Sequence, residues 1–398
     1  MTLNILQIIS CGYAAGGAEK SVLLLRDALT EQGHRVHIIS SDHGDAGLPH
    51  FSDTEFAEIT REGSGNLRRA LDHLWYRESY RVIRRVIAEF SPDVIHFHTM
   101  GQLSPSALFA ARGVPTVLTV HGPEEYLPRL LKWYFAPELF RQGRIGTGDL
   151  TLVGRIWTLF HSRVQRPLYR IAIRRHVGLI VAPSRYMEAE LKAEQLGAPV
   201  VQIYNGIELP AHRDLEHCDE ILYVGRLERV KGVELLVPAL EQVSRSLDGV
   251  VLHVVGDGPM RAAIESEVVR RDLSERVQVH GWLTGDRLLG AYASSTVVVI
   301  PSIWPENLPT VCIEALAIGR PVVCSNTGGM PELVEEGVTG SVVAPNDTEA
   351  LARSVTGLLT APDLGGMSRA ASASVSQFAI ATFVSQVLVA YTELREKT

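Results

Sequence analysis

The sequence contains no Asp-x-Asp motif and only four cysteines in its 398 residues. Without paired aspartates at that spacing, a metal ion held by aspartates is not indicated. The cysteines are Cys11, Cys218, Cys312 and Cys324, and they lack the spacing of metal ligands or of a redox motif. We therefore expect reduced thiols in the cytoplasm and no metal site.

Long hydrophobic runs are also missing, since none reaches the ~18 residues of a membrane span. Residues 3–10, LNILQIIS, follow no basic segment and are typical of a first strand, so we expect no signal peptide. The net charge of −7 argues against general nucleic-acid binding. A composition of 46% hydrophobic and 21% charged residues is that of a globular protein, and the length favours two domains.

Both halves of the chain alternate short apolar runs with amphipathic segments, a pattern that predicts two doubly wound α/β domains with parallel sheets facing a cleft. The first boundary falls at 205/206, where NGIELP opens a polar linker. Strands are expected at 3–9, 35–40, 93–97, 115–120, 178–182, 220–224, 250–255, 276–280, 296–300, 321–324 and 341–343. Helices of the first half are expected near 18–32, 67–90, 102–112 and 154–176.

The most informative stretch is 305–315, PENLPTVCIEA, which follows the apolar strand 297–300. Glu306 precedes an expected helix and Glu314 lies inside it, so both carboxylates are expected near one face. Pro309 fits the first helical turn, and Gly319 fits the C-cap. A helix N-terminus favours phosphate and carboxylates accept from hydroxyls, which points to a nucleotide-sugar. An isolated glutamate pair on a helix is more often solvated.

Other candidate residues also follow expected strands. Gly16 and Gly17 open a helix whose N-terminus suits phosphate, although a full G-x-G-x-x-G is absent. Arg226 and Lys231, in GRLERVKG, could meet a diphosphate, or they could belong to an exposed basic loop. His121 ends another strand; a single histidine is more often structural than catalytic, but this position favours an active site.

Together these residues resemble the retaining glycosyltransferases of family 4, which have the GT-B fold, over nearly the whole chain. The resemblance implies a donor site in which Glu306 contacts the donor sugar, Glu314 binds the ribose hydroxyls, and Arg226 and Lys231 neutralise the diphosphate. Gly16 and Gly17 would close against the diphosphate from the other domain, and Leu283 would contact the base. Asn307, Leu308 and Thr310 would also bind the donor. It also implies that the last helix crosses back onto the first domain. The expected domains are therefore 1–205 with 378–398, and 206–377.

One departure from the family pattern is Pro309, where many relatives have glycine. Proline has no N–H to donate, so this position cannot make the main-chain contact to the donor that glycine makes in those relatives. The family resemblance implies transfer of a sugar from a UDP- or GDP-sugar to an acceptor hydroxyl with retention of configuration and no further cofactor. His121 would position the sugar, and the leaving diphosphate would take the acceptor proton.

The segment 127–176 carries ten Arg or Lys and two acids among several aromatics. This pattern indicates either an amphipathic surface for an anionic membrane or acceptor, or a solvated helical face. We expect a cytoplasmic protein that can associate with the inner membrane face and acts on a lipid-linked or anionic glycan of the cell surface. Two alternatives stay open: a nucleotide-sugar 2-epimerase, and a non-catalytic nucleotide-sugar-binding subunit.

Overall fold

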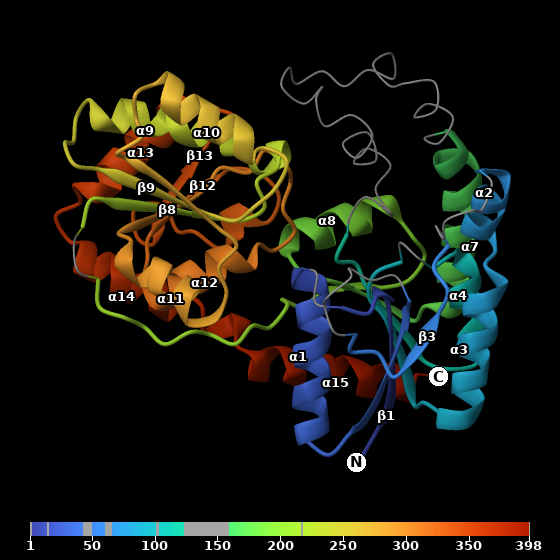
Figure 1. The fold of residues 1–398 in the computed structure, drawn as a ribbon. Coiled ribbons are helices and arrows are strands. Elements are labelled where there is room, and N and C mark those ends of the chain that lie inside the picture. The colour runs from blue at the N-terminus through green and yellow to red at the C-terminus, as the bar shows by residue number, and fades with distance from the viewer. Residues whose placement is uncertain are drawn as a thin grey trace. The chain divides into compact units, whose positions relative to one another are not determined.

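The computed structural model describes residues 2–13, 16–42, 50–59, 66–100, 103–122, 159–215 and 218–397 (Figure 1). The chain divides into two compact units, of which unit 1 comprises 1–207 with 380–398 and unit 2 comprises 208–379. Both changes of unit lie two residues beyond the boundaries expected from the sequence.

Unit 1 is built on a seven-stranded sheet of order β3-β2-β1-β4-β5-β6-β7, in which every pairing is parallel. Its strands are β1 (Asn4–Cys11), β2 (Arg35–Ser41), β3 (Thr54–Phe56), β4 (Val94–Phe97), β5 (Thr116–Thr119), β6 (Leu179–Ala182) and β7 (Val200–Gln202). Its helices are α1 (Gly17–Glu31), α2 (Asn66–Leu74), α3 (Arg77–Phe90), α4 (Pro105–Ala110), η4 (His161–Gln165), α7 (Arg166–His176), α8 (Arg185–Glu194) and α15 (Ile380–Glu396).

Helices α1 and α15 lie side by side on one face of the unit 1 sheet (Figure 1). Ile5 and Val117 of the sheet pack in one buried cluster with Leu25 of α1 and with Phe383 and Val387 of α15. The last helix of the chain therefore packs into the core of the first unit. The family resemblance had implied that this helix crosses back onto the first domain.

Unit 2 is built on a six-stranded parallel sheet of order β10-β9-β8-β11-β12-β13. Its strands are β8 (Glu220–Val224), β9 (Val251–Val255), β10 (Val277–Gly281), β11 (Val297–Ile300), β12 (Val322–Ser325) and β13 (Gly340–Val343). Its helices are η5 (Arg229–Lys231), η6 (Val233–Leu235), α9 (Leu236–Ser244), α10 (Arg261–Arg270), α11 (Gly285–Ser294), α12 (Thr310–Ile318), η7 (Met330–Glu332), α13 (Thr348–Leu359), α14 (Leu364–Ser374) and η8 (Ser376–Phe378).

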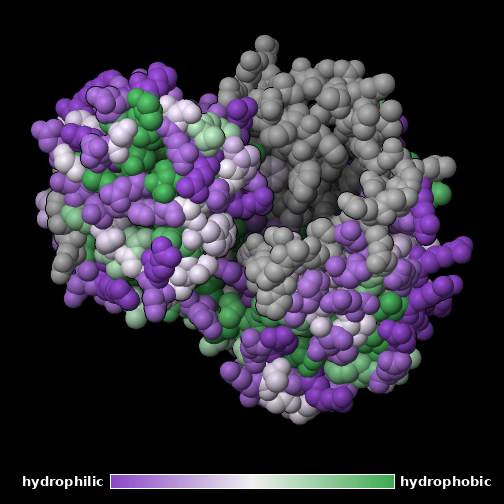
Figure 2. Space-filling model, in the orientation of Figure 1, coloured by the Kyte–Doolittle hydropathy of each residue, from purple (hydrophilic) through white to green (hydrophobic). Residues whose placement is uncertain are grey.

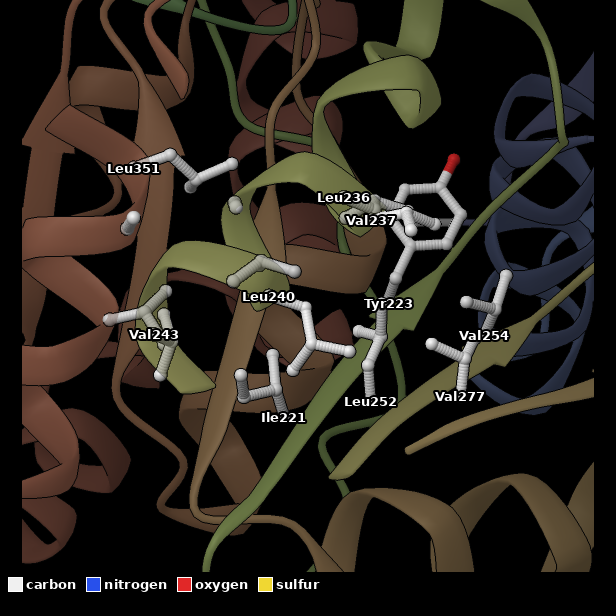
Figure 3. Packing of buried hydrophobic residues seen from close by; sticks show 14 of the residues in the cluster. Ile221, Tyr223, Leu236, Val237, Leu240, Val243, Leu252, Val254, Val277 and Leu351 are labelled. Carbon is white, nitrogen blue, oxygen red and sulfur yellow. The ribbon is translucent and has the colours of Figure 1, made fainter. Parts of the chain in front are cut away.

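Helices α9, α10 and α13 cover one face of this sheet, and α11, α12 and α14 cover the other (Figure 1). Strand residues such as Ile221 and Leu252 pack against Leu240 and Val243 of α9 (Figure 3). Tyr223 belongs to the same cluster, but its hydroxyl points away from the apolar side chains and donates to the Arg226 carbonyl at 2.9 Å (Figure 3). The core thereby holds the first loop that follows β8.

The expectation of two doubly wound parallel-sheet domains is confirmed, and each expected strand has a counterpart. The edge strands β3 and β7, of three residues each, were not expected. The helix expected at 67–90 is broken, because Tyr76 is extended and buried between α2 and α3. Its N–H donates to Ser104 Oγ at 2.8 Å and its hydroxyl to the Ala57 carbonyl at 2.6 Å, contacts that fix it outside a helix.

The predicted place of Pro309 in the first helical turn was wrong. It lies at the N-cap of α12, with φ −71° and ψ 109°, rather than in the first turn. Its carbonyl accepts from the N–H of Cys312 at 3.0 Å, so the residue begins the helix without needing an N–H of its own. Gly319 is the C-cap, with φ 93°, as expected.

Candidate functional site

The strand order of unit 2 reverses between β8 and β11, which are neighbours in the sheet although residues 225–296 lie between them in the chain. Open α/β sheets bind ligands at the carboxyl ends of the strands beside such a switch point. The segment 225–232 follows β8, and the segment 301–309 follows β11. Both segments carry the predicted donor-site residues.

The loops at this edge are joined to one another by main-chain hydrogen bonds. We call these bonded loops the loop rim. Four such bonds join the carboxyl ends of five neighbouring strands, β10, β9, β8, β11 and β12. The bonds are Gly256 N–H to Gly281 O (2.8 Å), Leu227 N–H to Asp257 O (2.9 Å), Ile303 N–H to Val230 O (2.9 Å) and Gly329 N–H to Glu306 O (2.7 Å). The main chain that carries the candidate residues is therefore fixed independently of their side chains.

Two glycines allow this close approach of main chain to main chain. Gly232 has φ 69°, and a Cβ there would lie 1.9 Å from the carbonyl oxygen of Pro301. Gly328 has φ 60°, and a Cβ there would lie 2.1 Å from the carbonyl oxygen of Glu306. Any other residue at either position would push the loops of adjacent strands apart.

Lys231 and Glu306 meet at the switch point. Lys231 Nζ lies 2.6 Å from Glu306 Oε1, which also accepts from Ser302 Oγ at 2.8 Å. The Glu306 side chain is 13% exposed and that of Lys231 is 29% exposed. A cation and a carboxylate are thus held together in a half-buried place, where each can still reach a ligand and where charges act more strongly than in water.

Arg226 is placed differently. Its side chain is 66% exposed, and its guanidinium pairs with Glu228 two residues along the same loop. It contacts neither Lys231 nor Glu306 in any hydrogen bond or ion pair of the described residues. A long exposed side chain on a fixed loop can still turn toward an anion, but the structure does not bring Arg226 to the Lys231–Glu306 pair.

Glu314 lies in the second turn of α12, and its Oε2 accepts from the hydroxyl of Tyr292 at 3.0 Å. Tyr292 is fully buried at the end of α11. Burial, followed by the neighbouring Glu314 charge, raises the pKa of Tyr292 well above its usual range, so the hydroxyl remains a donor. One carboxylate oxygen of Glu314 is therefore fixed by the protein, and the side chain stays partly exposed.

The remaining donor-site candidates lie on the same edge of unit 2. Asn307 and Leu308 belong to the loop before α12, and Thr310 is the first residue of that helix. All three are partly buried. Leu283 is also partly buried and lies in the turn between β10 and α11, next to Trp282, which is 63% exposed. These four candidates therefore lie at the same edge of the unit 2 sheet as Lys231 and Glu306, and their roles stay predictions.

In unit 1, Gly16 is the N-cap of α1 and Gly17 its first residue. Among the described residues, a Cβ on Gly16 would meet only Glu19 Oε2, at 3.3 Å. Glu19 lies in the first turn of the same helix, and burial raises the pKa of its carboxyl. An anion at this helix end would thus meet the helix dipole together with a carboxyl that takes up a proton more readily than usual.

His121 follows β5 in unit 1, and it lies in a group of polar side chains. Its Nε2 is 3.2 Å from His98 Nδ1, and its Nδ1 is 3.4 Å from Asn205 Nδ2. Burial lowers the pKa of His121 to about 4, so the ring is neutral near pH 7. A neutral imidazole can orient a hydroxyl by hydrogen bonding but carries no charge for a phosphate.

The sequence analysis missed His98. It directly follows β4, beside the switch point between β1 and β4, and its N–H donates to the Ile8 carbonyl at 2.9 Å. The signal was present, because the strand expected at 93–97 ends just before it. Strand-end position was the argument used for His121, and it applies equally to His98.

Two Rossmann-like units, each a parallel α/β sheet with its candidate residues at the carboxyl ends of the strands, make up the GT-B architecture. The chain matches the family model described as Glycosyltransferase Family 4 over residues 15–210 and the one described as Glycosyl transferases group 1 over 212–372. These matches indicate a glycosyltransferase with the GT-B fold, similar to family 4.

Curated relatives of the chain are glycosyltransferases. The chain is 29% identical to glycogen synthase of Mycobacterium tuberculosis, with 87% of this chain and 83% of that protein covered. It is 25% identical to the phosphatidyl-myo-inositol mannosyltransferase of Mycolicibacterium smegmatis, with coverage of 96% and 92%. Anabaena HepE, in a crystal structure with UDP and glucose, has the same fold, with a TM-score of 0.71, 19% identity and coverage of 98% and 100%.

The segment 127–176 falls largely outside the described residues, which resume at 159. The described part begins with Leu159, which is 58% exposed, and continues with η4 and α7, where Val164 and Ile171 are 41% and 43% exposed. Among the described residues, no helix has the length and apolar character needed to span a bilayer.

Proposed function

We propose that this protein is a retaining glycosyltransferase that moves a sugar from a UDP- or GDP-sugar to an acceptor hydroxyl. The observation that carries the proposal is the Lys231–Glu306 pair, held at 2.6 Å on the loop rim at the switch point of unit 2. A half-buried cation beside a carboxylate suits a ligand that combines a diphosphate with sugar hydroxyls. HepE, with the same fold, is seen with UDP and glucose, which supports a nucleotide-sugar as donor.

In this proposal the bond between the sugar C1 and the diphosphate oxygen breaks on one face, and the acceptor oxygen forms its bond to C1 on that same face. The acceptor proton passes to the departing diphosphate. Lys231 and Arg226 stabilise the negative charge that develops on that group, and Glu306 accepts from sugar hydroxyls. Glu314 holds the ribose, while Leu283, Asn307, Leu308 and Thr310 line the donor. Gly16 and Gly17 of unit 1 meet the diphosphate.

Both cations are paired with carboxylates, Lys231 with Glu306 and Arg226 with Glu228. A diphosphate must therefore share these cations with carboxylates that already contact them. Because the Lys231 contact is half-buried and the Arg226 contact exposed, removal of Lys231 should have the larger effect.

The first test compares donor turnover in variants of these residues. Lys231→Ala should lower kcat by about 10²-fold or more, the size expected when a preorganised contact to developing charge is removed. Arg226→Ala should lower it less, and Glu314→Ala should mainly raise the Kd for the nucleotide. A panel of UDP- and GDP-sugars, screened first by thermal shift, supplies the donor.

Arg245→Ala is the control, because Arg245 is 70% exposed beyond α9 and pairs only weakly with Glu241 at 3.5 Å. NMR of the product reports the configuration at C1. Wild-type turnover in both Lys231→Ala and Arg226→Ala would overturn the diphosphate assignment. Inversion at C1 would overturn the retaining mechanism, and release of an epimerised donor without transfer would favour a 2-epimerase. Donor binding without any turnover would favour a non-catalytic subunit.

We further propose a lipid-linked or anionic glycan acceptor in cell-surface polysaccharide synthesis, reached by a peripheral protein at the inner membrane face. The observation that favours it is the outer face of η4 and α7, where Arg163, Arg174 and Arg175 lie exposed among Val164 and Ile171. By contrast, the face of unit 2 in Figure 2 is mostly hydrophilic with small hydrophobic patches. The relative that acts on phosphatidyl-myo-inositol supports a lipid acceptor.

Not every arginine of this segment is free to meet a membrane. Arg166 pairs with Glu194, and Arg170 donates to the carbonyls of Glu194 and Gln195 at 3.3 and 3.2 Å. These two hold the end of α8, so their replacement would perturb the fold. The informative substitutions are therefore Arg163→Gln and Arg175→Gln, made together.

Liposome flotation tests this surface. Binding should increase with anionic lipid, at ~1 kcal/mol per arginine near the surface, and fall with salt. The double variant should bind more weakly while donor hydrolysis is unchanged. Arg81→Gln with Arg85→Gln, which removes two exposed charges from α3, is the matched control. Absence of flotation at every salt concentration, with efficient transfer to a small soluble acceptor, would contradict the proposal.

A further inference from the structure

Three imidazoles form a row on the face of the unit 1 sheet that α1 and α15 cover. His96 lies in β4, His98 follows it two residues on and so faces the same side, and His121 follows the neighbouring β5. The ring centroids of His96 and His98 are 4.0 Å apart, and those of His98 and His121 are 5.4 Å apart. His96 and His98 are almost fully buried.

The inner end of the row is anchored in the core. His96 Nδ1 is 2.6 Å from the hydroxyl of Tyr391, which α15 supplies, and His96 Nε2 is 2.7 Å from Thr119 Oγ1. Burial lowers the pKa of His96 to about 3 and that of His98 well below its usual range. All three rings are therefore neutral near pH 7, and each has one N–H donor and one acceptor nitrogen.

The hydrogen bonds at the outer end decide which nitrogen of His121 carries the hydrogen. As the Asn205 amide is oriented in the structure, its Nδ2 faces His121 Nδ1 at 3.4 Å, and because an amide nitrogen can only donate, His121 Nδ1 accepts in this arrangement. The hydrogen of His121 then lies on Nε2, which donates to His98 Nδ1 at 3.2 Å. His98 in turn must carry its hydrogen on Nε2.

His98 Nε2 is the one ring nitrogen of this row without a hydrogen-bond partner among the described residues. A buried N–H that is left unpaired destabilises the fold. An apolar ring here would avoid the unpaired N–H, but it would leave the N–H of His121 Nε2 without its acceptor.

We propose that His98 is a positioning residue that fixes the tautomer and ring orientation of His121, so that His121 Nδ1 is a hydrogen-bond acceptor. The inference rests on the active-site role proposed for His121. An acceptor nitrogen selects a substrate hydroxyl and disfavours a phosphate oxygen, which has no hydrogen to donate. The contact between His121 and Asn205, at 3.4 Å, is longer than an ordinary hydrogen bond and therefore weak. A sugar hydroxyl can replace it.

The tautomer is measured in the ligand-free protein with nitrogen-15-labelled histidine. We expect His121 and His98 each to be protonated at Nε2 and unprotonated at Nδ1, with a scalar coupling across the hydrogen bond between His121 Nε2 and His98 Nδ1. A hydrogen on His121 Nδ1, or on His98 Nδ1, would overturn the proposal. Since no substrate is needed, this result does not depend on the proposed reaction.

Kinetics of two His98 variants supply the second readout. His98→Phe keeps a ring in the stack but removes the acceptor, and it should lower kcat by ~10-fold or more with little change in the Kd for the nucleotide, as for other partners that orient a functional histidine. His98→Asn places an oxygen near the Nδ1 position and should recover part of the loss. Unchanged turnover in His98→Phe would contradict a positioning role.

His37→Phe is the matched control, since His37 lies on β2 of the same sheet and contacts Thr54 and Phe90 instead of His121. Circular dichroism checks that each variant folds. His121→Ala separates the two proposals: full turnover in that variant would remove His121 from the active site, whereas the nitrogen-15 shifts would still decide whether His98 fixes its tautomer.

Discussion

At the scale of single residues, burial of three neutral histidines makes the stability of unit 1 depend on pH. The pKa of His96 is lowered to about 3 and that of His121 to about 4, and that of His98 is also lowered. In the unfolded chain each would titrate near 6.5, so below that pH the unfolded state binds more protons. The stabilisation is complete above pH ~6.5 and is lost as the pH falls toward the folded pKa values.

We expect the free energy of unfolding to fall by up to ~1.4 kcal/mol per pH unit for each histidine in this window. Urea unfolding of wild type and His96→Gln, each measured at several pH values between about 7 and about 4.5, tests the effect. The variant should show a shallower pH dependence than wild type. Equal slopes would mean that the loss of stability in acid comes from other groups.

The site residues also show how far single-residue arguments reach. Lys231 and Glu306 were assigned to one ligand from their strand-end positions, their chemistry and the family resemblance, and they meet although they are 75 positions apart in the chain. That Arg226 would pair with Glu228 could not be predicted, because a loop's own geometry decides which neighbouring carboxylate a long side chain reaches. His98 was predictable by the argument applied to His121, and the roles of all these residues stay predictions.

At the scale of elements, Arg320 joins three segments of unit 2. The side chain is 1% exposed and donates to the carbonyls of Tyr292 and Ala293 at the end of α11 and to those of Arg213 and Asp214 in the linker. Burial lowers the pKa of its guanidinium, yet the planar group supplies donors in several directions at once.

Arg320→Lys should therefore destabilise unit 2 by about 3 kcal/mol, because an ammonium cannot reach these carbonyls together and leaves buried acceptors unpaired. The measurement is the shift of the urea midpoint. Arg353→Lys on α13, where the side chain is 70% exposed, is the control and should stay within about 0.5 kcal/mol of wild type. A similar small effect at Arg320 would show that water replaces the lost contacts.

The sequence predicted which helices and strands exist better than it predicted where they begin and end. Strand β8 was expected at 220–224 and is observed at Glu220–Val224, because its apolar run is bounded by a charged linker and a glycine. The break between α2 and α3 was not predictable, since Tyr76 leaves the helix only to satisfy bonds with Ala57 and Ser104, distant in sequence. Short edge strands such as β3 owe their pairing to a neighbour rather than to their own pattern.

At the scale of the whole molecule, the absence of Asp-x-Asp leads to an expectation about metal. Charge on the leaving diphosphate would be neutralised by Lys231, Arg226 and helix dipoles. Transfer should thus survive an excess of EDTA. Complete loss of activity on chelation, restored by Mg²⁺ or Mn²⁺, would contradict the assignment of charge neutralisation to side chains; a known metal-dependent transferase in the same assay verifies that chelation is effective.

The loop rim of unit 2 has a consequence for how such a protein can diversify. Its four main-chain bonds and the glycines at 232 and 328 define the shape of the donor edge, while the side chains at Leu283, Trp282 and Arg226 project from it. Under the proposed function, we expect substitutions at those positions to alter which base or sugar is accepted while the main-chain frame stays unchanged. Under that function, donor preference would thus be able to vary while the main-chain architecture stays the same.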